Sequence, residues 1–147
     1  FLAGRPGFAE SQIVRIRRLC EGRALLKVIL ETGEIGDAAA IRAAADLALA
    51  AGADFVKTST GKVAVNATPA SARLLIEAVR DGGRPAGVKA AGGIRSVAEA
   101  AAYLDLADAV MGPAWVGPAT FRFGASGLLG DVLATLDGTA PAASAGY

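Results

Sequence analysis

The strongest constraint on the fold of this chain is a repeat in which short apolar, β-branched runs alternate with longer Ala- and Leu-rich stretches at helical spacing. The apolar runs begin roughly every 30 residues, which is the length of one strand–helix unit and too long for a hairpin. Because the runs are apolar on both sides, they are typical of a parallel sheet covered by helices. The expected strands are Ala24–Glu31, Ala53–Thr58, Ala86–Ala90 and Thr120–Ala125.

Residues that favour helix starts stand before the helical stretches. They include N-cap residues, a proline in a first turn and one capping-box pattern. The expected helices begin after Asp37, at Thr68-Pro69, at the Ser96-x-x-Glu99 pattern and after Ser126, and an earlier helix covers Ala9–Leu19. The chain therefore reads as one helix followed by four strand–helix units.

Two architectures fit four such units, namely an open doubly wound α/β sheet or part of a (β/α)₈ TIM-type barrel. A whole barrel needs about 250 residues, and this chain has 147. Four units would be half of a barrel. We expect residues 1–138 to form this domain and residues 139–147 to be a flexible tail, because the sequence after Gly138 is small and polar.

Composition removes several classes of function. The chain has no His and a single Cys, Cys20, so it has neither the residues for Ser-His-Asp or Cys-His catalysis nor a Cys-rich zinc site. A net charge of +1 gives no strong positive electrostatic field that would attract nucleic acid or an anionic membrane. No long uncharged apolar run or signal-peptide pattern is present. With its lone cysteine, the chain fits a reducing compartment, and we expect a cytoplasmic location.

The lysines indicate where chemistry could occur. The chain has eleven Arg and only four Lys, and Lys27, Lys57 and Lys89 each fall inside an apolar strand. An arginine cannot lose its proton, whereas a buried lysine amine can be neutral and nucleophilic. The plainer interpretation is a lysine at a strand end whose ammonium reaches water. Three lysines in successive strands favour the chemical interpretation.

Lys57 and Lys89 hold equivalent places near the carboxyl ends of successive strands, where α/β enzymes carry their sites. Two ammonium groups close together in an apolar site repel each other, and desolvation adds to this effect, so the pKa of one amine is lowered. This arrangement predicts Schiff-base chemistry on a carbonyl, with Lys57 and Lys89 as the catalytic candidates.

Glycine-rich turns predict a phosphate site at the same end of the sheet. Glycine-bearing loops with bare amides at helix N-termini suit phosphate, and they follow the last two strands as in barrel phosphate sites. The candidate phosphate-binding residues are Gly61, Lys62, Gly92, Gly93, Gly124 and Ser126. Each turn alone is weak evidence, because tight strand-to-helix turns need glycine anyway.

Four segments carry a family resemblance. The string ADFVKTSTGKVAVNATPASARLL, Ala53–Leu75, closely resembles the Schiff-base segment of the deoxyribose-phosphate aldolase family. Leu25–Glu34, Gly87–Ser96 and Phe121–Leu129 continue the likeness in order, and it covers nearly the whole chain.

The resemblance implies a metal-free, cofactor-free class I aldolase on a (β/α)₈ barrel. Such an enzyme reversibly cleaves 2-deoxy-D-ribose 5-phosphate to acetaldehyde and D-glyceraldehyde 3-phosphate. It implies that Lys57 forms the imine, that Lys89 tunes Lys57 and joins in proton transfer, and that the glycine loops hold the phosphate. The family's catalytic aspartate would lie upstream of Phe1, so we expect the C-terminal half of the barrel.

The sequence departs from the family pattern at two positions. Ala90 replaces the usual proline after the second lysine, and Gly127 replaces the second serine of the last phosphate loop.

Two alternatives stay open: another phosphosugar lyase or isomerase, or a non-catalytic half-barrel that self-associates. The expected partners are a phosphosugar substrate and either a second copy of the chain or a missing N-terminal half.

Overall fold

In the computed structural model, which describes residues 1–139, four parallel strands form one sheet in the order β1-β2-β3-β4. The element bounds are α1 Pro6–Cys20, β1 Lys27–Ile29, α2 Thr32–Ile35, α3 Ala38–Ala50, β2 Phe55–Lys57, α4 Pro69–Asp81, β3 Gly87–Ala91, α5 Val97–Met111, β4 Phe121–Gly124 and α6 Gly127–Leu136. Sequential parallel strands joined by helices are the arrangement of one half of a (β/α)₈ barrel. The predicted α/β half-barrel is therefore confirmed. The predicted tail, residues 139–147, lies outside the described residues except for Thr139.

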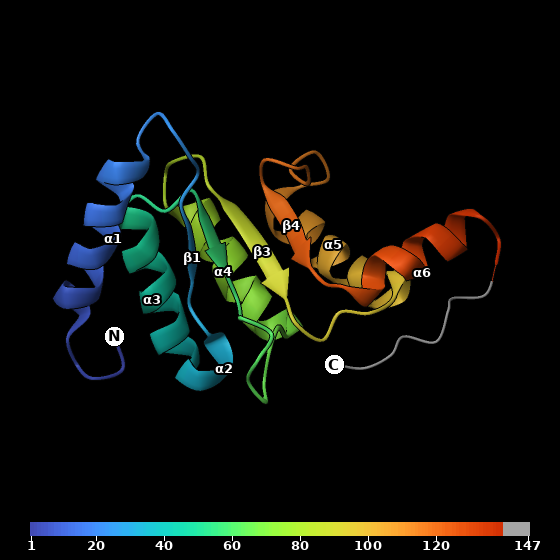
Figure 1. The fold of residues 1–147 in the computed structure, drawn as a ribbon, viewed down its shortest axis with the longest axis horizontal. Coiled ribbons are helices and arrows are strands. Elements are labelled where there is room, and N and C mark those ends of the chain that lie inside the picture. Colours follow the sequence, from blue (N-terminus) through green and yellow to red (C-terminus); the bar gives the residue numbers. More distant parts are fainter. Residues whose placement is uncertain (140–147) are drawn as a thin grey trace.

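The helices cover one face of the sheet and bury a single core. Helices α3, α4 and α5 pack side by side behind the strands, with α1 beside α3 and α6 beside α5 (Figure 1). Val56 and Val88 are fully buried at the centre of this core, together with Leu75 and Ile76 of α4. Alternate strand residues, including Lys57 and Lys89, face the other way.

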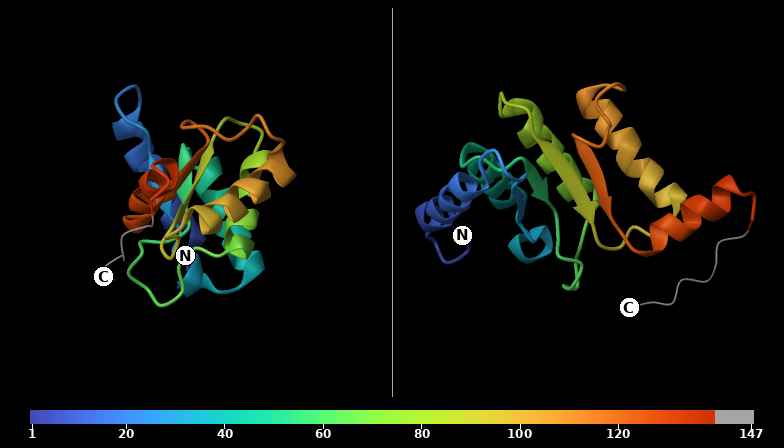
Figure 2. Two further views of the ribbon diagram at one scale, coloured as in Figure 1. Left: turned by 90° about the vertical axis from the view of Figure 1, so that its right-hand side faces the viewer. Right: turned by 45° about the horizontal axis from the view of Figure 1, so that its top comes forward.

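The two ends of the half-barrel carry helices with exposed apolar side chains. Helices α1 and α6 lie at opposite ends of the molecule (Figure 2). Leu129, Leu133 and Leu136 of α6 are 64%, 52% and 77% exposed, and their spacing places them on one helical face. No helix within residues 1–139 is long and apolar enough to span a bilayer.

The predicted helix starts are mostly confirmed. The Asp37 carboxylate accepts the Ala40 N–H at 2.8 Å, and the Ser96–Glu99 capping box is formed. Ser126 occupies the N-cap position of α6 but makes no capping hydrogen bond. Thr32–Ile35 form the short helix α2 directly after Glu31.

Strands β1, β2 and β4 are shorter than the apolar runs that predicted them, whereas β3 has the predicted length and is shifted by one residue. The run Ala24–Glu31 contains only the three residues of β1, which has β2 as its single described neighbour. Beyond that pairing the Leu30 and Thr32 N–H groups still donate to the Lys57 and Thr58 carbonyls, but the regular ladder ends and the chain turns at Glu31, whose φ is 58°.

Candidate active site

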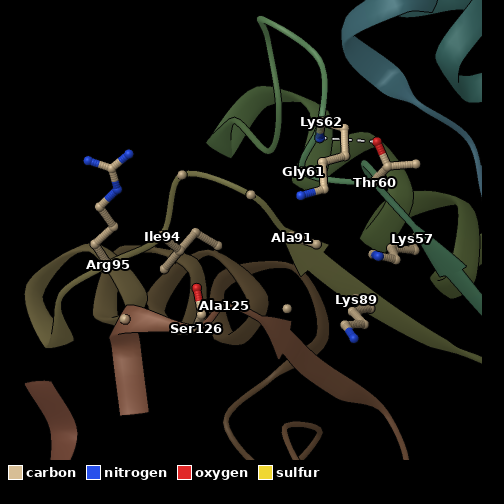
Figure 3. A pocket seen from close by; sticks show the side chains of 14 residues that line it. Lys57, Thr60, Gly61, Lys62, Lys89, Ala91, Ile94, Arg95, Ala125 and Ser126 are labelled. Atoms are coloured by element: carbon tan, nitrogen blue, oxygen red, sulfur yellow. Dashed lines mark hydrogen bonds between the residues drawn. The ribbon is translucent and has the colours of Figure 1, made fainter. Parts of the chain in front are cut away.

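A pocket of about 530 Å³ opens at the carboxyl ends of β2, β3 and β4 (Figure 3). All eight predicted site residues line it: Lys57, Gly61, Lys62, Lys89, Gly92, Gly93, Gly124 and Ser126. They come from four segments spread over 70 positions of the sequence, from 57 to 126. The structure thus brings the catalytic candidates and the phosphate candidates to one place.

The strand register places the two lysines next to each other. Lys57 pairs with Lys89 in the parallel β2–β3 ladder, one level above the Val56–Val88 pair. Since successive side chains alternate between faces, burial of the two valines under the helices turns both lysines toward the pocket. Neighbouring strands lie about 4.8 Å apart, so the two side chains start side by side.

Burial and charge act together on Lys57. Desolvation is the larger cause that lowers the pKa of the Lys57 amine below its usual range, and the Lys89 ammonium lowers it further. The Glu31 carboxylate acts in the opposite direction. The net effect lowers the pKa of Lys57 and so moves its amine toward the neutral, nucleophilic form that imine formation requires.

Lys27 of β1 is the remaining lysine in a strand, and it lies one layer below the pocket. It pairs with Phe55 in the β1–β2 ladder, and its Nζ lies 5.6 Å from the centroid of the Phe55 ring. The Arg122 guanidinium carbon lies 4.4 Å from that centroid. Burial first, and then the charges of Lys89, Arg122 and Lys57, lower the pKa of Lys27. Lys27 does not line the pocket.

Two of the glycines are required by close approaches. A Cβ on Gly92, whose φ is +88°, would lie 2.6 Å from the Cβ of Asn66. A Cβ on Gly124 would lie 2.7 Å both from the Cβ of Ala91 and from Cε of Lys89, so this glycine leaves space for the neighbouring strand and for the lysine side chain. Gly124 was predicted only as a phosphate contact. The structure adds a close approach to Lys89, while the phosphate contact stays a prediction.

The pocket can hold an anion. Lys57, Lys62, Lys89 and Arg95 line it, and no carboxylate is among its lining residues within the described part of the chain. The Ser126 hydroxyl makes no capping bond at the start of α6, which leaves it available to a ligand beside the helix N-terminus. Among residues 1–139, no group of three or more His, Cys, Asp or Glu is arranged to hold a metal ion.

Sequence reasoning missed two polar side chains that line the pocket, those of Thr60 and Arg95. Thr60 lines it, and its hydroxyl accepts the Lys62 N–H at 3.2 Å (Figure 3). Arg95 also lines it, although its guanidinium extends away from Lys57 and Lys89 (Figure 3). The position of Arg95, two residues after Gly93, was the available signal, because a guanidinium close to a glycine turn can pair with a phosphate.

The fold and the pocket define a barrel-type α/β protein with paired lysines at the carboxyl end of its sheet. The model of the DeoC/LacD family of aldolases matches residues 9–128, and the chain belongs to this family.

Curated and solved relatives agree with this family. The chain is 53% identical over 148 residues to a deoxyribose-phosphate aldolase of Agrobacterium fabrum (strain C58), a match that covers 100% of this chain and 57% of that protein. The apo form of a candidate deoxyribose-phosphate aldolase of Toxoplasma gondii ME49 superposes with a TM-score of 0.82 and 28% identity over 93% of this chain and 55% of that one. A tetrameric deoxyribose-phosphate aldolase of Aeropyrum pernix superposes with a TM-score of 0.68 and 27% identity. This match covers 89% of the present chain and 50% of that one. The chain therefore spans about half the length of these relatives.

Proposed function

We propose that this chain supplies the Schiff-base half of a class I aldolase that reversibly cleaves 2-deoxy-D-ribose 5-phosphate to acetaldehyde and D-glyceraldehyde 3-phosphate. The observation that carries the proposal is the register pairing of Lys57 with Lys89 inside a cationic pocket. The 53% identical deoxyribose-phosphate aldolase supports the choice of substrate.

In the proposed reaction, the Lys57 amine attacks the aldehyde carbon of the open-chain sugar. Loss of water gives a protonated imine. The 3-hydroxyl then loses its proton and becomes the carbonyl of D-glyceraldehyde 3-phosphate as the C2–C3 bond breaks. The electron pair of the C2–C3 bond moves toward the imine, which becomes an enamine, and D-glyceraldehyde 3-phosphate departs. Protonation of the enamine and hydrolysis of the resulting imine release acetaldehyde and regenerate the Lys57 amine. No external oxidant or reductant enters the balance.

The remaining pocket residues have supporting roles in this proposal. Lys89 keeps the Lys57 amine neutral by charge repulsion and takes part in proton transfer. The turns at Gly61-Lys62, Gly92-Gly93 and Gly124–Ser126 hold the phosphate through backbone N–H groups, the Lys62 ammonium and the Ser126 hydroxyl. Binding energy from the phosphate orients the reacting carbon, which lies several bonds away.

We also propose that residues 1–138 act as the C-terminal half of a complete barrel and that an acid outside these residues finishes the proton relay. The absence of a carboxylate among the described lining residues supports this division. The complete barrel would be cytoplasmic, in keeping with the lone Cys20, and could be formed with a missing N-terminal half or by assembly of copies.

A chimaera tests the proposal. In this "completed barrel", the present chain replaces the matched 57% of the Agrobacterium aldolase. We expect the completed barrel to cleave deoxyribose 5-phosphate and to have a kcat/KM for unphosphorylated deoxyribose lower by at least about 10²-fold. Equal kcat/KM values for the two sugars would remove the phosphate role of the loops. A folded chimaera without aldolase activity would contradict the proposed reaction.

A non-catalytic half-barrel is the second candidate, and the apolar face of α6 favours it for the chain by itself. Exposed Leu129, Leu133 and Leu136 would drive association of copies. In that case the 147-residue chain would form oligomers in light scattering and bind no substrate. An isomerase of phosphosugars would instead turn over substrate without a borohydride-trappable imine.

A further inference from the structure

Glu31 has a backbone conformation that its residue type rarely adopts. Its φ and ψ are 58° and 60°, and it is the one non-glycine residue with positive φ among residues 1–139. Left-handed backbone is uncommon for residues with a Cβ, and it is found mostly in Asn, Asp and Gly. The surrounding structure must therefore hold this conformation in place.

The hydrogen bonds on both sides of Glu31 hold its backbone. The Leu30 N–H donates to the Lys57 carbonyl at 2.9 Å, and the Thr32 N–H donates to the Thr58 carbonyl at 2.8 Å. Between these two bonds the chain advances by two residues just past the end of β1 but by one residue at the end of β2, which places an extra residue at Glu31 as in a β-bulge. Bulges commonly redirect a side chain next to an active site.

The redirected carboxylate contacts the loop that follows Lys57. Its Oε1 and Oε2 accept the Thr60 N–H at 3.2 and 3.1 Å. The Thr60 hydroxyl in turn accepts the Lys62 N–H at 3.2 Å (Figure 3). Thr60, Gly61 and Lys62 all line the pocket, so these bonds connect Glu31 to one wall of the candidate phosphate site.

Glu31 also contributes charge. It is not among the pocket-lining residues, four of which are cationic, yet its carboxylate raises the pKa of Lys57 against the effects of burial and Lys89. Glu31 is therefore close enough to act on Lys57 electrostatically while its oxygens hold the Thr60 N–H.

We propose that Glu31 is a positioning residue of this site: the left-handed bulge at the end of β1 directs its carboxylate to hold the Thr60–Lys62 loop as a wall of the phosphate site beside Lys57. The identification of the bound group as phosphate rests on the proposed function. The anchoring of the loop does not, and the two parts can be tested separately.

The anchoring is tested by amide hydrogen exchange at Thr60 in the 147-residue chain. We expect Glu31→Gln, which keeps an acceptor oxygen, to leave Thr60 exchange within about threefold of the parent. Glu31→Ala, which removes the acceptor, should raise it by at least tenfold. Glu31→Gly separates backbone strain from the carboxylate, because glycine adopts the left-handed region freely and still lacks the acceptor. The Thr60 exchange rate of Glu31→Gly should therefore match that of Glu31→Ala. Glu34→Ala, three residues further on, is the control and should change nothing.

Binding of inorganic phosphate, followed by calorimetry, tests the role of the wall. We expect the Kd to rise about fivefold to tenfold in Glu31→Ala and Glu31→Gly and to stay within twofold in Glu31→Gln and Glu34→Ala.

The charge of Glu31 is tested by the pH dependence of borohydride-trapped acetaldehyde on Lys57. Glu31→Gln should shift the rise of trapping to lower pH, because loss of the carboxylate lowers the pKa of Lys57. A purely structural residue would leave that profile in place.

Unchanged Thr60 exchange in folded Glu31→Gly would overturn the inference, as would unchanged phosphate affinity in that variant. Absence of any imine on Lys57 in the parent would count against the proposed function instead, and the Thr60 exchange would still decide whether Glu31 anchors the loop.

Discussion

Lys57 and Lys89 are register partners on adjacent parallel strands, and both face the same pocket. Their proximity follows from the ladder and does not depend on a flexible loop. The valines that precede them in register, Val56 and Val88, are fully buried in the core. A slip of one residue in either strand would bury a lysine and expose a valine, so core packing fixes the relationship between the two amines.

Removal of the Lys89 charge should raise the pKa of Lys57 toward its usual value, because Lys89 is the second cause of the lowering after burial. In the completed barrel, Lys89→Leu should therefore move the alkaline rise of imine formation up by about one pH unit. Rates of cyanoborohydride trapping across pH would measure this shift. Lys89→Arg keeps the charge and serves as the matched variant, with its profile near that of the parent. If both variants left the profile unmoved, burial alone would set the Lys57 amine.

Gly124→Ala should disturb catalysis through Lys89, because the added Cβ would lie 2.7 Å from Cε of that side chain. A displacement of about 1 Å at a reacting group can cost on the order of 10²-fold in rate. We expect a loss of that order in kcat of the completed barrel, together with a lower free energy of unfolding, because the added Cβ would also lie 2.7 Å from the Cβ of buried Ala91. Gly130→Ala on α6 meets nothing within 4 Å and should be neutral or stabilise by about 0.5–1 kcal/mol. Equal kcat values for the two variants would contradict the role assigned to Gly124.

The stability of the chain should depend on pH through Lys27 and Lys57. Both have a folded-state pKa below their ordinary value of 10.5. Between the lowered pKa and 10.5, the unfolded chain binds more protons than the folded one, so the free energy of unfolding rises with pH. Below the lowered pKa, both states are protonated and this contribution is constant and unfavourable.

Urea unfolding between about pH 7 and pH 10 measures this dependence. Lys27→Met and Lys57→Met should each flatten the rise, whereas Lys62→Met, a lysine of an exposed loop, should leave it as it is. Tyr103, whose pKa is raised by burial, opposes the rise near pH 10, so the comparison with the two Met variants decides: equal slopes in the parent and both variants would mean that neither amine has a lowered pKa in the folded chain.

Much of the fold could be predicted from local pattern. The parallel order of the strands follows from the strand–helix period, and the starts of α4 and α5 follow from Thr68-Pro69 and Ser96. The extent of β1 could not be predicted, because pairing depends on a neighbour and not on apolar content. The residues of β1 are a subset of a longer apolar run, and the run ends in a bulge at Glu31.

The candidate site divides in the same way. Lys57 and Lys89 each stand one residue before the end of their predicted strands, Ala53–Thr58 and Ala86–Ala90, so their proximity could be predicted from the sequence. The bond between Glu31 and the Thr60 N–H joins residues 29 positions apart and depends on a left-handed backbone that no local pattern indicates. The close approach of Gly124 to Lys89 likewise exists only once β3 and β4 are paired.

The central claim is that Lys57 is the residue that forms the imine, and borohydride reduction in the presence of acetaldehyde tests it most directly. Peptide mapping by mass spectrometry of the completed barrel should place one ethyl group on Lys57. Lys57→Arg should abolish both the adduct and turnover, while Lys27→Arg, one layer below the pocket, should keep both. An adduct on Lys27, Lys62 or Lys89 in the parent, or turnover that survives in Lys57→Arg, would contradict the account.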